Sequence, residues 1–394
     1  MINRLLSRSL RGQLAITGGA ILLALVVGAV VMVLTSPIIT GEFDFWLWGE
    51  AYLALLQGAT GIAISVDPFS VDFRGLDGVI DSLVRATPYI LGGLAVGLGF
   101  KAGLFNIGAQ GQFLMGALGA VIAGIALSDA PTVIAVPVAL VAGLLAGAAY
   151  GFIPGWLKAF TGAHEVVVTI MLNFVALQII SWAVSGPLRA AGATFARTPD
   201  VGEARLWVIA GDPGHLLHSG VFIAFLAVPI VWWVLYRSTI GFEIRTVGAN
   251  PDAARYAGMR PRMLIVLTMT ASGLLAGLAG GIEILGVQHY LPAAYATTVG
   301  FDAITVALLG RANPWGIMFG GLLLGALRAG APLMQIKAGV PVQMIDILQG
   351  VILFFLAADL IVRWVFRIRD ARGTDVDELR TVTSSYGGSS VSKG

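Results

Sequence analysis

The sequence predicts an all-α, polytopic integral membrane protein with about ten transmembrane helices and an internal repeat. Of the 394 residues, 57% are hydrophobic and only 12% are charged, whereas soluble domains carry about 25% charged residues. The mean hydropathy is +0.87. A soluble core could not take up this much apolar surface, and several apolar stretches approach the length of about 20 residues that crosses the hydrocarbon layer.

The apolar stretches follow one another along most of the chain. The first, residues 14–34, follows a basic N-terminus and is longer than the core of a signal peptide, so we expect a retained helix. The later stretches lie near residues 86–100, 109–127, 131–153, 164–185, 218–236, 263–285, 300–310, 315–333 and 343–363. Together they indicate about ten crossings.

The segments between these stretches divide the chain into three regions. Residues 1–85 hold the first helix and an external segment in which "FWLWGEAYLALLQGATG" is typical of an interfacial amphipathic helix. Residues 86–363 form the main transmembrane domain, and its long external segment 186–217 is either a connector or a surface for an external partner. Residues 364–394 are polar and rich in Gly and Ser, which predicts a disordered cytoplasmic tail.

Lysine and arginine are unevenly distributed between the two sets of loops. The side that holds the N-terminus has Arg4, Arg8, Arg11, Lys101, Lys158, Arg237, Arg245, Arg255, Arg260, Arg262, Arg311, Arg363, Arg367, Arg369, Arg372, Arg380 and Lys393. The opposite side has Arg74, Arg85, Arg189, Arg197, Arg205 and Lys337. Because cytoplasmic loops carry the excess of positive charge, we expect both termini in the cytoplasm.

Composition excludes several classes of function. The chain has no cysteine, which rules out disulfides and thiolate metal sites, and its four histidines are scattered. Its formal net charge of +2 gives no reason to expect a nucleic acid partner. The sequence places no nucleophile, metal ligand set or acid pair at useful spacing, so we predict no enzyme activity, no metal and no directly bound cofactor.

Two segments in different halves of the chain resemble each other. "LFNIGAQGQFLMGALGA" (104–120) and "LLGRANPWGIMFGGLLLGA" (308–326) each place an asparagine, Asn106 or Asn313, in a break before a glycine-rich apolar helix. Interrupted segments at matching places in duplicated halves often mark the path of a transporter. Shared glycine-rich composition is the alternative explanation. Small residues four apart, such as Gly143 and Gly147, also predict close packing between helices.

The break "NIGAQGQ" (residues 106–112, the polar break) puts three amides into an otherwise apolar region. Polar residues at membrane depth usually face a bundle interior or a water-filled path. Amides offer donors and acceptors to a polar solute, and a flat aromatic side chain could stack on a nucleobase. The candidate pathway residues are Asn106, Gln110, Gln112, Asn173, Phe174, Gln178 and Asn313. The alternative is that the amides bond neighbouring helices to one another.

Charged residues inside the apolar stretches are few. The main ones are Glu165, Glu283, Asp302, Arg328, Asp346 and Asp359. Several lie at predicted helix ends, where capping or snorkelling accounts for them. They do not resemble a chain of buried acids for a proton relay, which favours a neutral polar cargo and an energy source other than protons.

Between the sixth and seventh stretches, "NPDAARY" contains the signals for a short helix. Asn250 is a favoured N-cap, Pro251 suits the first helical position, and Asp252 complements the positive helix end. Gly258 ends the helix. Residues 251–257 are therefore predicted to form a helix of about two turns, about 10 Å long.

This short helix is a candidate contact surface for another protein. Three alanines leave one side nearly bare while an aromatic side chain projects, a shape that suits a groove on a partner; a capped connector is the alternative. The residues concerned are Gly248, Asn250, Pro251, Asp252, Ala253, Ala254, Arg255, Tyr256, Ala257 and Gly258.

The motif "VGANPDAARYAGM" resembles the cytoplasmic coupling-helix signature of permease subunits of ATP-binding-cassette importers, in the branch for branched-chain amino acids, simple sugars and nucleosides. "FKAGLFNIGAQGQ", "HEVVVTIMLNFVALQI", "FDAITVALLGRANPWGI" and "LQGVILFFLAADL" are similar to segments of its nucleoside and simple-sugar permeases. These motifs occur in order between about residues 86 and 363. One departure is Gln110, where the family pattern leads us to expect Glu.

The resemblance implies a permease subunit that forms the translocation path for a neutral polar solute, with nucleosides preferred. A simple-sugar importer and a stand-alone secondary transporter are the alternatives. The sequence has no Walker A loop, so a separate cytoplasmic ATP-binding subunit would use the ATP and engage the coupling helix.

The resemblance also implies further partners and a location. They are a second permease subunit, with a homologous heterodimer preferred to a homodimer, an extracellular substrate-binding protein or lipoprotein, and membrane lipid. The expected location is the bacterial cytoplasmic (inner) membrane.

Overall fold

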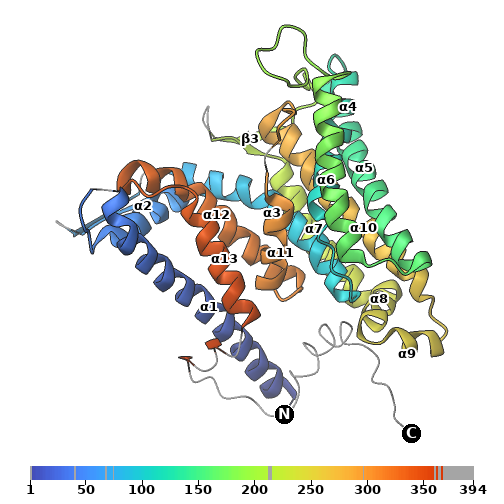
Figure 1. The fold of residues 1–394 in the computed structure, drawn as a ribbon, viewed down its shortest axis with the longest axis horizontal. Coiled ribbons are helices and arrows are strands. Elements are labelled where there is room, and N and C mark those ends of the chain that lie inside the picture. The colour runs from blue at the N-terminus through green and yellow to red at the C-terminus, as the bar shows by residue number, and fades with distance from the viewer. Residues whose placement is uncertain are drawn as a thin grey trace.

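The computed structural model describes residues 2–39, 41–66, 69–73, 75–211, 215–295, 297–358, 361–362 and 365–366. Over these residues the fold is built almost entirely from helices, which confirms the all-α class (Figure 1). The helices are α1 (Ile2–Ile39), α2 (Leu47–Thr60), α3 (Asp77–Lys101), α4 (Ala109–Ala126), α5 (Thr132–Thr161), α6 (Glu165–Ser185), α7 (Gly220–Arg237), α8 (Thr239–Ala249), α9 (Pro251–Tyr256), α10 (Pro261–Glu283), α11 (Val299–Leu309), α12 (Pro314–Ala338) and α13 (Met344–Ala357). A π-helical turn, η1 (Ile284–Gln288), continues α10. The predicted tail, residues 364–394, lies outside the described residues apart from 365–366.

Eight helices among the described residues are long and apolar enough to cross a membrane: α1 from Ala15 onward, α3, α4, α5, α6, α7, α10 with η1, and α12. The apolar helices α11 and α13 have 11 and 14 residues, which is about 17 and 21 Å of helix and less than a hydrocarbon layer of about 30 Å. The ten predicted stretches therefore correspond to eight candidate spans and two shorter helices.

Helix ends differ from the prediction where polar residues or proline interrupt the apolar pattern. Helix α3 begins at Asp77 rather than near residue 86, so the expected boundary between residues 85 and 86 falls inside this helix. Helix α5 continues through Pro154 to Thr161. A hydropathy pattern reports where the chain is apolar, and a helix can continue beyond that region.

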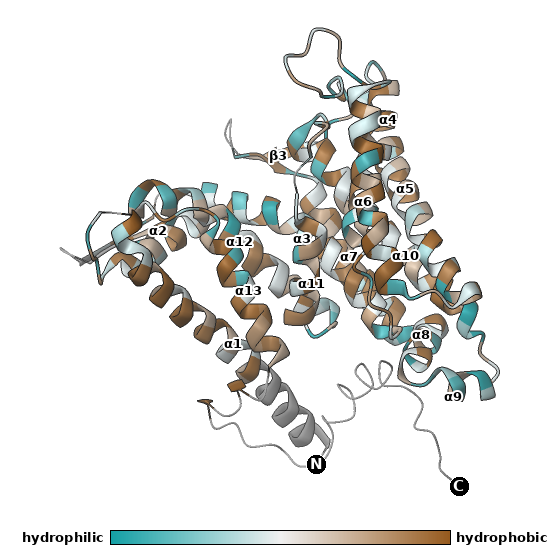
Figure 2. Ribbon diagram, viewed as in Figure 1, coloured by the Kyte–Doolittle hydropathy of each residue, from teal (hydrophilic) through white to brown (hydrophobic). Residues whose placement is uncertain are grey.

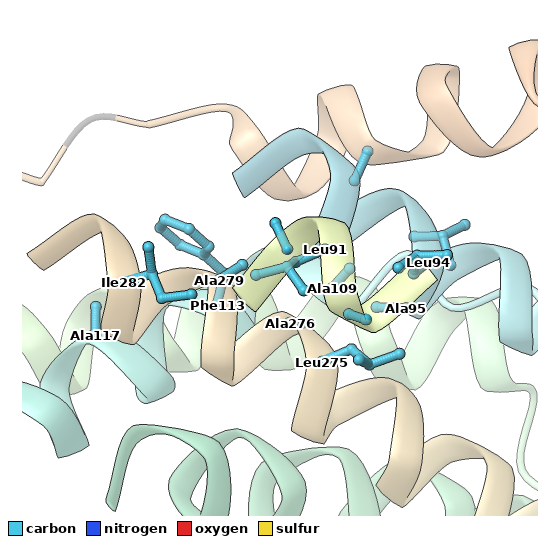
Figure 3. Packing of buried hydrophobic residues seen from close by; sticks show 14 of the residues in the cluster. Leu91, Leu94, Ala95, Ala109, Phe113, Ala117, Leu275, Ala276, Ala279 and Ile282 are labelled. Carbon is cyan, nitrogen blue, oxygen red and sulfur yellow. The ribbon is translucent and has the colours of Figure 1, made fainter. Parts of the chain in front are cut away.

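The core lies where α3, α4 and α10 meet (Figure 3). Leu91 and Leu94 of α3, Phe113 of α4 and Ile282 of α10 pack there with at most 1% of their surface exposed. Every residue of α3 between positions 86 and 99 is buried. Helix α3 is thus surrounded by other helices, as expected for a helix that is hydrophobic all round.

Helices α5 and α10 approach each other through glycines, as the four-residue spacing of small residues predicts. A Cβ atom at Gly147 would overlap the backbone of Gly273 and Gly277, and one at Gly277 would lie 2.6 Å from the carbonyl oxygen of Gly143. Helix α4 joins the same contact, because a Cβ at Gly116 would overlap the backbone of Gly277. The three helices therefore pack backbone against backbone.

The N-terminal region contains the predicted amphipathic helix and one element that the sequence analysis missed. Helix α2 buries Leu47, Ala51 and Ala54 and packs against α12, where a Cβ at Gly58 would lie 2.9 Å from the Cα atom of Gly330. The missed element is an antiparallel hairpin of β1 (Ile62–Val66) and β2 (Phe69–Phe73). Strands β3 (Val208–Ala210) and β4 (Leu217–His218) form a second small pair in the long external segment.

The connecting segments gather at two ends of the bundle. Helices α8 and α9 lie at one end and β3 at the other (Figure 1). Hydrophilic residues gather on α9, while the part of α1 from Ala15 onward is mostly hydrophobic (Figure 2). At the β3 end, the Thr198 N–H donates to the Leu291 carbonyl at 3.0 Å. At the α9 end, Gly103 packs against the backbone of Gly248. This grouping agrees with the two sets of loops separated by the lysine and arginine pattern.

Candidate functional site

The short helix α9 forms where its capping residues predict it. The side-chain Oδ1 of Asn250 accepts hydrogen bonds from the backbone N–H groups of Asp252 and Ala253, each at 3.0 Å. These bonds satisfy two of the donors that a helix start leaves without an intrahelical partner. Pro251 occupies the first turn, and Gly258 ends the segment in the left-handed region with φ +83°.

The exposed side of α9 is formed by fewer alanines than expected. Tyr256 is 94% exposed and projects from the helix, and Ala253 and Ala257 are also exposed. Ala254 is fully buried instead. Its side chain faces the core of the chain, so it belongs to the support of α9 and not to the bare side that the sequence predicted.

Gly248 connects the α8–α9 segment to the loop before the polar break. A Cβ atom at Gly248 would overlap the carbonyl oxygen of Lys101 and would lie 2.8–2.9 Å from Ala102 and Gly103. Gly103 adopts φ +69°, a conformation that favours glycine. The backbone of α8 is therefore in direct contact with the chain that leads from α3 to the polar break.

The polar break is held together by a network of buried side chains. The Asn106 Nδ2 group donates to Gln112 Oε1 and to Ser272 Oγ, both at 2.8 Å. Ser272 Oγ in turn donates to the Ala95 carbonyl at 2.6 Å. Asn106 and Gln112 are at most 1% exposed. The network joins α4 to α10 and α3.

Two more amides anchor the start of α4 to other elements. Gln110 Oε1 accepts from the Gly300 N–H and Gln110 Nε2 donates to the Thr297 carbonyl, both at 2.8 Å. Asn173 Oδ1 accepts from the Gly111 N–H at 2.8 Å, and its Nδ2 donates to the Ile107 carbonyl at 3.0 Å. A carboxylate at position 110 could accept but not donate, so these contacts account for Gln110 in place of the expected Glu.

The polar break lies near the middle of its neighbouring helices. Asn173 is eight residues from the start of α6 and Ser272 is eleven residues from the start of α10, which is about 12 and 17 Å along each axis. Irregular backbone at such depth is tolerated where protein buries it or where it lines a cavity. Here the amides of the break bond protein groups, as the interhelical alternative predicts. A role in the path stays a prediction.

The remaining candidate pathway residues lie elsewhere. Phe174 is 61% exposed and Gln178 is exposed on the side of α6 that faces away from Asn173. Asn313 is exposed at the start of α12, where its Oδ1 accepts from the Trp315 N–H at 3.0 Å. The structure therefore brings Asn106, Gln110, Gln112 and Asn173 together, and places the other three at separate positions.

The sequence analysis missed a charged network among α11, α12 and α13. The Arg328 Nη2 group donates to Asp302 Oδ2 at 3.1 Å and to Asp346 Oδ1 at 2.7 Å, and Gln349 Nε2 donates to Asp302 Oδ1 at 2.7 Å. Arg328 is fourteen residues inside α12, so pairing with carboxylates, and not snorkelling from a helix end, accounts for it. The signal in the sequence was a set of charges of both signs in apolar stretches.

Two histidines lie near each other at the β3 end of the bundle. His218 of β4 is 1% exposed, and neither of its ring nitrogens has a hydrogen-bond partner among the described residues. Burial, followed by the influence of His289, lowers the pKa of His218 from its ordinary value of 6.5 to about 4. Burial, followed by the charge of Arg205, also lowers the pKa of His289. In both cases the shift of the pKa favours the neutral imidazole.

Comparison with known proteins identifies several similar permeases. The chain is 40% identical over 323 residues to the guanosine ABC transporter permease protein NupP of Bacillus subtilis, covering 80% of this chain and 92% of NupP. It is 36% identical over 356 residues to the glucose ABC transporter permease protein TsgB13 of Haloferax volcanii, covering 84% and 93% of the two chains. It is 32% identical over 334 residues to the nucleoside ABC transporter permease protein NupB of Lactococcus lactis, covering 83% and 91%.

A second Bacillus subtilis guanosine permease protein, NupQ, is 25% identical over 253 residues, covering 62% of this chain and 78% of NupQ. The family model described as "Branched-chain amino acid transport system / permease component" matches residues 78–357, well over half of the chain. The match begins at the first turn of the central helix α3 and ends at the last residue of α13. The chain therefore belongs to the family of permease components of branched-chain amino acid transport systems.

Proposed function

We propose that this chain forms the translocation path of an ATP-binding-cassette importer for nucleosides. A separate cytoplasmic subunit would bind and hydrolyse the ATP, because the chain itself carries no Walker A loop. The observation that carries the proposal is α9, a capped and exposed helix that is fixed by Ala254 on its buried side. A rigid helix of this kind is suited to transmit a push from a partner.

Nucleosides are the proposed cargo because of the relatives. NupP and NupQ are named for guanosine and NupB for nucleosides. The resemblance between this chain and NupP extends over almost the whole of NupP. A nucleoside offers hydroxyl groups and base edges that amides such as those of the polar break can bind.

Simple sugars are the second candidate cargo. The relative TsgB13 is named for glucose and is 36% identical to this chain over a similar length. Amides bind sugar hydroxyl groups as well as base edges. The geometry of the polar break therefore does not choose between the two classes.

The polar break is the proposed deep part of the path. Asn106 and Gln112 bond each other, and Asn106 also donates to Ser272, in the present arrangement; a passing solute would replace some of these bonds. Gly248 would transmit motion from the ATP-binding subunit to this region, because the backbone of α8 contacts the backbone of residues 101–103. A push on α9 would reach the loop before the break without passing through a flexible side chain.

We place the α9 end of the bundle in the cytoplasm of a bacterial cell and the β3 end outside. The distribution of lysine and arginine supports this orientation and puts both termini in the cytoplasm. A substrate-binding protein or lipoprotein would then meet the external segment 186–217 at the outer end. The ATP-binding subunit would meet α9, and a second permease would complete the path.

Uptake by native membrane vesicles tests the proposal. Vesicles from cells that natively produce the chain would receive labelled guanosine or glucose, with ATP present and the proton gradient collapsed. We expect ATP-dependent uptake of guanosine that exceeds uptake of glucose. Uptake that stops when the gradient collapses would point to a secondary transporter, and preferential glucose uptake would point to the sugar importer.

The variant Ala257→Arg tests the role of α9 in the same vesicles. Ala257 is exposed, so the larger side chain leaves the packing of α9 intact. We expect ATP hydrolysis that is no longer linked to uptake. Ala254→Arg is unsuitable because it would place a charge at a fully buried position.

A further inference from the structure

Helix α6 has one side packed against the bundle and one side uncovered. Its packed side carries Thr169, Asn173, Ala176 and Ile180, which are buried against neighbouring helices. It packs against α4 and α5, and Figure 1 shows it running along the bundle beside them. The opposite side carries Phe174, Val175, Gln178, Ile179 and Trp182, which line a shallow surface pocket. We call these five residues the α6 face.

The α6 face is more than an ordinary lipid-facing surface because it contains an uncovered amide. Phe174 and Trp182 are 61% and 70% exposed, and Gln178 lies between them at the same four-residue spacing. No hydrogen bond from the Gln178 side chain to any described residue is found. An amide without a partner is costly in hydrocarbon.

With α6 spanning the hydrocarbon layer, the position of Gln178 keeps its amide away from the bulk water at either surface. It is thirteen residues from the start of α6 and seven residues from its end, which is about 20 and 10 Å along the helix. The length of α6 matches a hydrocarbon layer about 30 Å thick, so Gln178 lies about 10 Å inside the nearer edge of this layer. A glutamine side chain is shorter than this distance, so its amide cannot reach the interface as lysine or arginine would by snorkelling.

The covering group must therefore be a protein within the membrane that offers hydrogen bonds. An ATP-binding subunit at α9 and a binding protein at the outer loops would both lie outside the hydrocarbon layer. A second permease lies inside it, and two guanosine permease proteins of one bacterium, NupP and NupQ, both resemble this chain. Polar side chains on facing helices supply such bonds in membrane proteins.

We propose that the α6 face is the surface on which a second permease chain of this family docks within the membrane. This proposal rests on the proposed importer, and it adds where the two permeases meet. Asn173 ties the inner side of α6 to the polar break. Docking on the outer side therefore places only one helix between the partner and the break, with Phe174 and Gln178 at the seam between the two chains.

Site-directed crosslinking tests this docking surface in native membranes. The chain has no cysteine, so Gln178→Cys creates a single thiol to which a benzophenone maleimide can be attached. Leu226→Cys on α7 is the matched control, because Leu226 is 60% exposed and six residues from the start of its helix, a similar depth. After illumination, products would be separated by mass and identified by mass spectrometry.

We expect position 178 to give an adduct with a permease chain of this family, and position 226 to give mainly lipid adducts. Lipid adducts alone at position 178, or permease adducts at 226 and not at 178, would overturn the proposal. Gln178→Leu provides a second readout. Loss of one interhelical hydrogen bond predicts about threefold less of the second permease in the purified complex, whereas a lipid-facing Gln178 predicts no loss.

The same experiment separates this inference from the proposed function. If a second permease co-purifies with the chain but never crosslinks through the α6 face, the docking surface is wrong and the importer stands. If no second permease or ATP-binding subunit accompanies the chain from native membranes, the importer itself is wrong.

Discussion

Replacing Asn250 with Ala removes the N-cap of α9 without changing its buried side. The side-chain oxygen of Asn250 accepts from the N–H groups of Asp252 and Ala253. Both bonds are exposed, so water can solvate the freed donors, and the loss is that of an ordinary N-cap, about 1 kcal/mol. This corresponds to about a fivefold fall in the ratio of formed to frayed helix.

The effect is large for this helix because α9 has only six residues, and short helices have little stability of their own. We expect guanosine uptake per ATP hydrolysed to fall in vesicles that carry Asn250→Ala, while the amount of chain in the membrane is unchanged. The control is Asn250→Asp, since Asp is an equally favoured N-cap and its charge suits a helix start.

The pair of variants gives a clear decision. If Asn250→Ala transports with the wild-type ratio of uptake to hydrolysis, then the integrity of α9 does not matter for coupling. If Asn250→Asp is impaired as strongly as the Ala variant, the side chain acts by something other than capping. Either result would refute the reasoning that connects the cap to transport.

Three further changes have expected outcomes. Gly248→Ala would press a methyl group against the carbonyl of Lys101. We expect the free energy of unfolding, measured by thermal denaturation, to fall by about 1–3 kcal/mol and uptake to be reduced. Wild-type values for both would show that the contact between α8 and residue 101 is not tightly packed. Asn173→Leu would leave the buried Gly111 N–H unsatisfied, costing about 1–3 kcal/mol; altered cargo selectivity in uptake assays would place Asn173 on the path, whereas a loss of yield alone would make it structural. Because the pKa of His218 is lower in the folded chain than its ordinary 6.5, the unfolded chain binds more protons between pH 6.5 and 4. Stability should therefore rise with pH across this window and be lost as pH falls through it. The variant His218→Gln should flatten the dependence of the melting temperature on pH. An unchanged dependence would show that His218 is not the source of the change in stability with pH.

The elements that the sequence predicted well are those with local causes. An apolar stretch long enough to cross lipid is visible in composition, and the start of α9 follows from the adjacent pair Asn250 and Pro251. Helix α3 was placed too late because Asp81 and Arg85 interrupt the apolar pattern, although a helix can continue into the aqueous layer. The hairpin β1–β2 was missed because its strands are short and follow a helix directly.

The partners of the polar side chains could not be predicted in the same way. Asn106 bonds Ser272, which is 166 residues away, and Gln349 bonds Asp302 across 47 residues. A single sequence carries no signal for such pairs. The residue types indicated that amides of the polar break matter, but the sequence did not show that Asn173 faces inward toward them while Gln178 faces outward.

The glycine contacts among α4, α5 and α10 have a mechanical consequence. Backbones that touch directly have no layer of side chains between them that could deform. These three helices must therefore move together as one rigid unit. Relative motion of helices during a transport cycle would then occur at interfaces lined by side chains. One such interface is where Arg328 of α12 bonds Asp302 of α11 and Asp346 of α13. A methyl group added to one of these glycines would push all three helices apart, whereas the same addition at an interface lined by side chains would be accommodated by small side-chain movements.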